Sequence, residues 1–213
     1  MNTRHISFVA LSLLTAILSG CAWGNHYDYQ SVRATIPQAS KKSAVAVVVV
    51  DQRPDVISSS HDNNYIGTTR DGYGIPFKVY TRSGSPLSED LSKAITSSLI
   101  AAGYQASPIT FTPVTDEATA KAKLLAAPAD RKILVTINKW ESSTLINTEL
   151  DTKINVQVYD RSGKILENES FSETTGLGGN FFVPELHARE SVLSQTSSFL
   201  SHVFSSPKIK GSL

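Results

Sequence analysis

Ala44-Val45-Ala46-Val47-Val48-Val49-Val50 is the stretch that decides the fold, because it joins seven apolar residues, five of them Val, and ends at Asp51. β-Branched side chains at this density favour a strand. An apolar run without polar alternation is typical of a strand buried on both faces. We therefore predict that residues 44–50 form the central strand of a sheet.

Signals further along the chain predict the remaining elements. Asp71-Gly72 lies between residues 65–69 and 75–81, and this favours a hairpin. Ser85-Pro86 starts a helix that Gly103 ends, and Leu91, Ile95 and Leu99 form an apolar stripe facing the central strand. The other expected elements are a strand at 104–112, a helix from 115 to before Pro128, strands at 131–142, 150–159 and 164–174, a loop at 176–180 and a helix at 184–204. The prediction is one α/β (α+β) domain, residues 44–213, with a mixed, mostly antiparallel sheet and about three helices.

The N-terminus reads as an export signal. Arg4 precedes an apolar core over residues 6–18, which is too short for a membrane span of about 20 residues. Leu18-Ser19-Gly20-Cys21 then resembles the bacterial lipobox, and Cys21 is the only Cys of the chain. We predict a signal peptide over residues 1–20 and a lipid on Cys21; the alternative is a secretory signal cut elsewhere.

Residues 21–43 are expected to form the lipidated Cys and a tether, because they show no sustained periodicity. Trp23, Tyr27 and Tyr29 have two interpretations: interfacial aromatic residues, or a tail that packs on its own domain. In lipoproteins of envelopes with two membranes, Asp after the lipidated Cys commonly retains the protein at the inner membrane. Ala22 stands there instead, and this resemblance implies an outer-membrane anchor with the domain in the periplasm.

Composition excludes several function classes. Lys and Arg total 20 against 19 Asp and Glu, so no basic surplus indicates nucleic acid as a partner. A single Cys excludes a disulfide framework within the chain and a zinc site of several thiolates. Gly176-Leu177-Gly178-Gly179 is followed by Phe181, where a dinucleotide fingerprint needs its third Gly. We expect no metal, no cofactor and no enzymatic activity.

Two places are candidate sites. Asp51, Arg53 and Asp55 follow the central strand, where ligands of open α/β sheets bind; the alternative is a local ion pair. Tyr65, Arg70 and Tyr73 lie on the loop over residues 65–74 and are the candidate partner-binding residues, because Tyr and Arg are enriched at interfaces. The alternative for that loop is an ordinary hairpin tip.

The chain resembles the YajG-like family of bacterial lipoproteins. The resemblance is carried by the lipobox, by the Val-rich strand ending in Asp51-Gln52-Arg53, by Ala102-Gly103-Tyr104 at the helix end, and by the strand pair at 133–140 and 150–158. It implies the fold, and it carries over no catalytic residues because the family has no established reaction.

The sequence thus predicts an envelope lipoprotein that is held in the membrane by lipid on Cys21 and binds an envelope protein or glycan without catalysis. Two other functions stay open. One is an envelope enzyme that uses Asp51 and Asp55 as acid and base. The other is a structural module that forms homo-oligomers through an exposed sheet edge.

Overall fold

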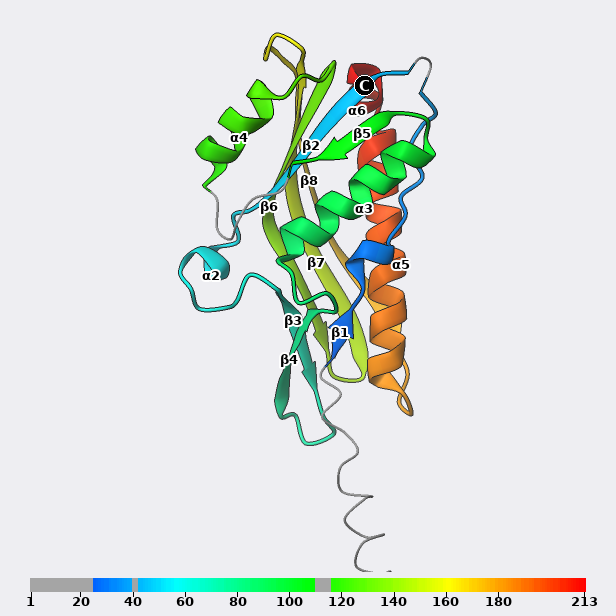
Figure 1. Ribbon diagram of the computed structural model, residues 1–213. Helices are drawn as coiled ribbons and strands as arrows, with labels where there is room; N and C mark the ends of the chain where they lie inside the picture. Colours follow the sequence, from blue (N-terminus) through cyan, green and yellow to red (C-terminus); the bar gives the residue numbers. More distant parts are fainter. Residues whose placement is uncertain (1–24, 40–41, 110–115) are drawn as a thin grey trace, which may run out of the picture.

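The computed structural model describes residues 25–39, 42–109 and 116–213, and within these ranges the chain forms one α+β domain. A mixed eight-stranded sheet carries helices on both faces (Figure 1). The predicted fold class is confirmed, with two short α-helices and one short 3-10 helix in addition to the three helices expected. The strands are β1 (His26–Tyr27), β2 (Ala44–Asp51), β3 (Tyr65–Arg70), β4 (Pro76–Thr81), β5 (Gln105–Pro108), β6 (Arg131–Thr144), β7 (Asn147–Asp160) and β8 (Ile165–Gly179). The helices are η1 (Tyr29–Ser31), α2 (Pro54–Ile57), α3 (Leu87–Ala101), α4 (Glu117–Ala126), α5 (Pro184–Ser205) and α6 (Pro207–Ser212).

Strand β2 is central, as the valine run predicts. It pairs in parallel with β6 at one edge and with β5 at the other. Its alternate side chains from Val45 to Val49 belong to the large core, whereas those from Ala46 to Val50 belong to a smaller cluster on the opposite face. Both faces of β2 are therefore buried, and this explains the lack of polar alternation.

Strands β6, β7 and β8 correspond to the three strands predicted at 131–142, 150–159 and 164–174; they form an antiparallel meander, and each is longer than predicted. One edge of β6 pairs with β7 along nearly its whole length. The other edge pairs first with β2 and then with β3, where Gly67 lies opposite Ser142. This change of partner divides the sheet into one end with β2 and β5 and another with β3, β4 and β1 (Figure 1).

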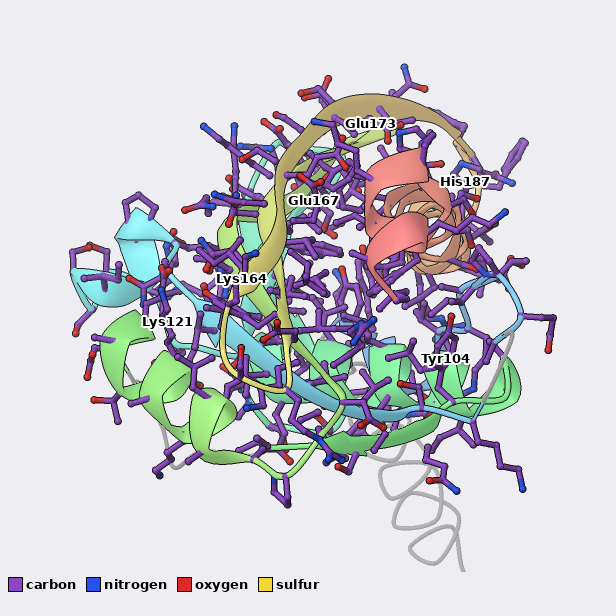
Figure 2. All side chains as sticks on the ribbon, turned by 90° about the horizontal axis from the view of Figure 1, so that it is seen from above. Tyr104, Lys121, Lys164, Glu167, Glu173 and His187 are labelled. Carbon is purple, nitrogen blue, oxygen red and sulfur yellow. The ribbon has the colours of Figure 1, made fainter. Side chains whose placement is uncertain are left out.

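Helices α3 and α5 cover one face of the sheet. Leu91, Ile95 and Leu99 are each at most 1% exposed and share a cluster with the β2 valines, which confirms the predicted stripe. Helix α4 covers part of the other face through Ala120 and Leu124. In the view from above, α4 and α5 lie on opposite sides of the curved sheet (Figure 2).

The segment before β2 does not act as a free tether over its described part. Strand β1 pairs with β4, and Tyr27 and Tyr29 are 2% and 0% exposed. The Tyr29 hydroxyl accepts a hydrogen bond from Trp140 Nε1 at 3.0 Å. These aromatic side chains complete the core, so the structure corresponds to the tail packed on its own domain. Trp23 lies outside the described residues, and the domain begins near His26 rather than at residue 44.

The predicted loop at residues 176–180 is mostly strand. Residues 176–179 close β8, and Gly179 pairs with Asn147 at the end of β7. A Cβ on Gly179 would lie 2.0 Å from the carbonyl oxygen of Ile146. Gly179 therefore allows the end of β8 to approach the β6–β7 turn closely, and the stretch does not form a loop of its own.

The two additional α-helices are short and begin at proline. Helix α2 starts at Pro54, in the connection between β2 and β3, and helix α6 starts at Pro207, beyond the predicted end of the last helix. Proline suits the first helical position, because its nitrogen needs no hydrogen-bond partner there. Ser206 separates α5 from α6, and its side chain accepts a hydrogen bond from the Ile209 amide.

Candidate functional site

Membrane attachment is predicted at residues that the structure does not describe. Cys21 and the signal peptide over residues 1–20 lie outside the described residues. Among the residues that are described, no helix combines the length and apolar character needed to cross a membrane.

The charged cluster after β2 is a buried ion pair. Arg53 Nη2 lies 2.7 Å from Asp51 Oδ2, and Arg53 Nε donates to both oxygens of the same carboxylate. Arg53 Nη1 donates to the carbonyls of Tyr65 and Trp140 at 2.7 and 3.1 Å. The arginine is 2% exposed. This side chain therefore ties the end of β2 to β3 and β6, as the local ion-pair alternative expects.

Asp55 has a different partner from Asp51. Its Oδ2 lies 3.2 Å from Nδ1 of His61, and the His61 ring stacks on Tyr65 with 3.9 Å between centroids. The Tyr65 hydroxyl is 2.9 Å from Thr68 Oγ1, and burial raises the pKa of Tyr65. The two carboxylates thus engage other residues rather than each other.

The structure separates the three candidate partner-binding residues. Tyr65 begins β3 and is 3% exposed, whereas Tyr73 is 94% exposed in the β3–β4 turn. Arg70 ends β3, is half-buried, and donates to Ser143 Oγ at 3.2 Å. Tyr65 and Arg70 are five residue steps apart along the strand, which corresponds to about 16 Å. Arg70 and Tyr73 lie together at one end of the molecule, and Tyr65 does not.

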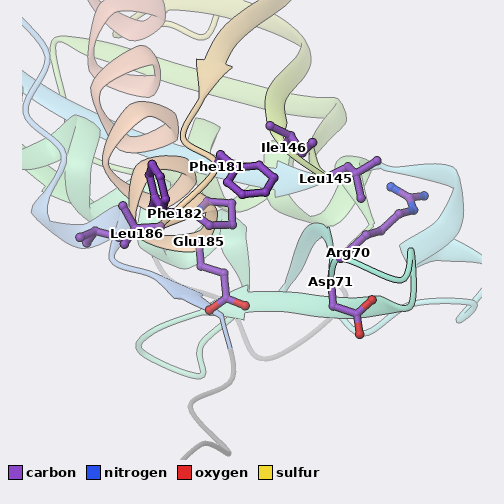
Figure 3. Close-up of a pocket in the computed structure, with 11 residues that line it drawn as sticks. Arg70, Asp71, Leu145, Ile146, Phe181, Phe182, Glu185 and Leu186 are labelled. Carbon is purple, nitrogen blue, oxygen red and sulfur yellow. The ribbon is translucent and has the colours of Figure 1, made fainter.

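At that end an open groove of about 430 Å³ lies between the β3–β4 turn, the β6–β7 turn and the β8–α5 loop. Residues 70–72, 145–146 and 181–186 line the groove; together with residues 73–77, which complete the β3–β4 turn and begin β4, we call them the tip. Figure 3 shows Phe181 next to Ile146 and Leu145, Phe182 near Leu186, and Arg70 and Asp71 across from the rings. Apolar side chains dominate the groove, and they come from three connections that lie far apart in the sequence.

The tip exposes large apolar side chains to an unusual degree. Phe182 is 90% exposed and Phe181 74%, and their rings meet edge to face with 5.7 Å between centroids. Other apolar side chains of the tip that are about half exposed are Leu145, Ile146, Ile75, Phe77, Val183 and Leu186. Contiguous exposed apolar surface of this kind marks interaction sites.

Sequence reasoning missed Phe181 and Phe182. From the sequence, Phe181 is noted only where a glycine motif lacks its third Gly, and Phe182 is not noted. Leu186, near the start of α5, is also 42% exposed. A signal was present: Phe181-Phe182-Val183 is an apolar run at a strand-to-helix connection, where polar residues are expected.

No metal centre emerges from the described residues: nowhere among them do three or more His, Cys, Asp or Glu side chains converge in a way that could hold an ion. His187 on α5 makes a 3.1 Å hydrogen bond to the Leu177 carbonyl through Nε2. This contact fastens α5 to β8.

Comparison with known proteins supports the fold and leaves the family open. No family model matches the chain, and no curated protein matches it in sequence. Protein XCC0632 from Xanthomonas campestris, of family DUF330, is similar in structure, with a TM-score of 0.52 and 14% identity over 85% of this chain and 94% of that one. At this identity the likeness shows a shared fold alone. The resemblance to YajG-like lipoproteins therefore stays a prediction.

Two further solved structures are similar at lower TM-scores. The PelC dodecamer from Paraburkholderia phytofirmans has a TM-score of 0.42 and 14% identity over 82% of this chain and 94% of that one. Lipoprotein GNA1162 from Neisseria meningitidis has a TM-score of 0.30 and 15% identity over 73% of this chain and 99% of that one. At these scores, neither indicates what this chain does.

Proposed function

We propose that this protein is an envelope lipoprotein, anchored in the outer membrane by lipid on Cys21, and that its periplasmic domain is a non-enzymatic binding module that makes contact through the tip. The observation that carries the proposal is the groove of about 430 Å³ with Phe181 and Phe182 on its apolar side. When a partner covers side chains of this size, the removal of their apolar surface from water stabilises the complex by about 25 cal/mol for each Å².

The candidate enzymatic residues support a structural role better than a catalytic one. An acid/base pair needs two carboxylates that share a substrate or a proton. Instead, Asp51 forms an ion pair with the buried Arg53, and the Asp55 carboxylate contacts the His61 ring. Neither Asp51 nor Asp55 borders the tip groove.

The chemistry of the tip narrows the partner class. Among the described residues that line the groove, the charged ones are Arg70, Asp71 and Glu185, and the Asp71 carboxylate already accepts hydrogen bonds from the Tyr73 and Ile75 amides. A glycan needs many directed hydrogen bonds, whereas an apolar wall suits a protein or lipid surface. Of the expected partners, the tip therefore favours an apolar one over a glycan.

Photo-crosslinking in living cells tests the binding role. A crosslinking amino acid replaces Phe182 in one variant and Ser162 in the control; Ser162 is exposed in the β7–β8 turn, at the other end of the molecule (Figure 1). We expect adducts from position 182 that disappear when Cys21→Ala removes the anchor, and fewer from position 162. Equal adduct yields at the two positions would refute the tip as the contact surface.

Self-association is a second candidate function, because β8 pairs only with β7 among the described strands. Its other edge could receive a second copy. Light scattering of the detergent-solubilised protein tests this function directly: a single mass equal to one chain plus its lipid would exclude a stable oligomer.

A further inference from the structure

The tip has a specific occupant, and the position of the anchor points to it. We propose that the tip rests on the lipid bilayer, with Phe181, Phe182 and Tyr73 in the interfacial region, so that the domain stands on the membrane instead of moving freely below it. This inference rests on the proposed lipid anchor at Cys21 and adds the partner of the tip.

The length of chain between the anchor and the domain keeps the domain close to the membrane. Strand β1 begins at His26 and is paired with Tyr80 of β4. The five Cα steps from Cys21 to His26 span at most about 18 Å. A tether over residues 21–43 would have permitted a far greater distance between the membrane and the domain. Residues 26–39, however, are packed on the domain.

The tip extends beyond His26 by a distance similar to the span from Cys21 to His26. Strand β4 begins at Pro76, four residues before Tyr80, so the start of the β3–β4 turn lies about 13 Å beyond the level of His26. Strand β1 runs parallel to β4, so the chain enters β1 from the side of that turn. A bilayer that holds the acyl chains of Cys21 is therefore within reach of the tip.

The three connections of the tip lie at the same end of the domain as the start of β1 (Figure 1). Helix α5 begins there with Pro184 and extends away for 22 residues, about 33 Å. The domain is thus elongated away from the tip. A contact at the tip therefore orients its long axis roughly along the membrane normal.

The Phe pair is held in place for insertion. The Asn180 side-chain oxygen accepts hydrogen bonds from the amides of Phe182 and Val183 at 2.9 and 3.2 Å. Gly179 is fixed against the β6–β7 turn by its close approach to Ile146. Because the backbone is already ordered, inserting the two rings costs little conformational entropy. Tyr73, with an apolar ring and a polar hydroxyl, suits the headgroup region.

Charge does not contribute to this contact. The tip contains Arg70 together with Asp71 and Glu185, and it lacks the cluster of Lys and Arg that attracts anionic lipids. The contact is therefore expected to depend on apolar insertion alone, with no requirement for anionic lipid and no sensitivity to salt.

Spin-label depth measurements on the full lipidated protein test the proposal. Cys21 is the only Cys, and the lipid blocks its sulfur, so a Cys introduced elsewhere takes the label alone. The test variants are Phe182→Cys and Tyr73→Cys, and the matched control is Ser162→Cys at the opposite end. Each protein is reconstituted into phosphatidylcholine vesicles, and collision of the nitroxide with oxygen and with a water-soluble nickel chelate is measured.

We expect labels at positions 182 and 73 to be severalfold less accessible to nickel than the label at 162, with higher accessibility to oxygen. Replacing both phenylalanines by Ser in the Tyr73→Cys protein should restore nickel access at position 73. Adding anionic lipid or salt should change neither result.

The outcomes separate the two proposals. If the protein floats with the vesicles while the label at 182 is as open to nickel as the label at 162, the tip does not contact lipid and the anchor still stands. If the label at 182 is shielded from both oxygen and nickel, a protein surface covers the tip, and the lipid proposal is wrong. If the protein does not float, the anchor itself fails, and this inference fails with it.

Discussion

Replacing Arg53 by Met is expected to destabilise the domain more than any surface substitution. The arginine is 2% exposed, and the side chain of its partner Asp51 is 7% exposed. In the variant, the Asp51 carboxylate would remain buried without its counter-charge, and the carbonyls of Tyr65 and Trp140 would lose a donor. Removing one partner of a buried ion pair costs about 3–5 kcal/mol.

This loss is large enough to measure by thermal unfolding in detergent. For a chain of this size, 1 kcal/mol changes Tm by about 2–4 °C, so Arg53→Met should lower Tm by roughly 10 °C. Arg82 is exposed, and Arg82→Met serves as the control, with a change of free energy of unfolding within about 0.5 kcal/mol. The double variant Asp51→Asn/Arg53→Met should lose less than Arg53→Met, because no charge is left buried.

Two results would refute this reasoning. One is an Arg53→Met protein that unfolds at the same temperature as the parent, because the ion pair would then contribute nothing to stability. The other is a double variant that is less stable than Arg53→Met, because relief of the unpaired charge would then play no part.

Three other substitutions follow from the same structure. Leu91→Ala should cost about 2–5 kcal/mol of unfolding free energy in urea titration, whereas Ile100→Ala, at a position 56% exposed, should cost far less; equal costs would show the stripe to be misassigned. Gly179→Ala should cost about 1–3 kcal/mol because its Cβ would meet the Ile146 carbonyl, while Gly176→Ala, which meets nothing within 4 Å, should not; tolerance at 179 would contradict the close approach. Burial raises the pKa of Asp90 in the folded state above the ordinary pKa that it has in the unfolded chain. The folded state therefore loses stability as the pH rises above that ordinary pKa and Asp90 ionises. Asp90→Asn should therefore raise Tm at pH 7, and this gain should vanish as the pH falls below about 4; a gain that is equal at both pH values would contradict this cause.

The sequence predicted best those elements whose burial follows from one local pattern. The unbroken valine run of β2 and the stripe of α3 each depend on one pattern, and both were found where expected. Strand β7 shows the limit of this reasoning. Asn155 and Tyr159 alternate with apolar residues along this strand, and this pattern predicts that both lie on a solvent-exposed face. Tyr159 is nevertheless 1% exposed, because it belongs to the cluster that α4 forms on that face. Periodicity gives the face of a strand but not what covers it.

The candidate site was harder to predict, because it depends on contacts between distant parts of the chain. Tyr65 and Tyr73 look equivalent in sequence. Tyr65 is buried because it lies at the start of β3 and stacks on His61, whereas Tyr73 is exposed because it lies in the β3–β4 turn. The apolar tip joins three connections, and no local pattern shows that Phe181 lies next to Ile146 (Figure 3). The sequence indicates residue types in each connection, and only the fold brings them together.

The lipid on Cys21 is the claim on which the proposed function and the placement of the tip both depend. Mass spectrometry of the N-terminal peptide, from protein purified out of the membrane fraction, tests it most directly. The account predicts that the mature chain begins at Cys21, that its sulfur carries diacylglycerol, and that Cys21→Ala yields an uncleaved precursor without lipid. A mature chain that begins at another residue, or that carries Cys21 with a free thiol, would contradict it.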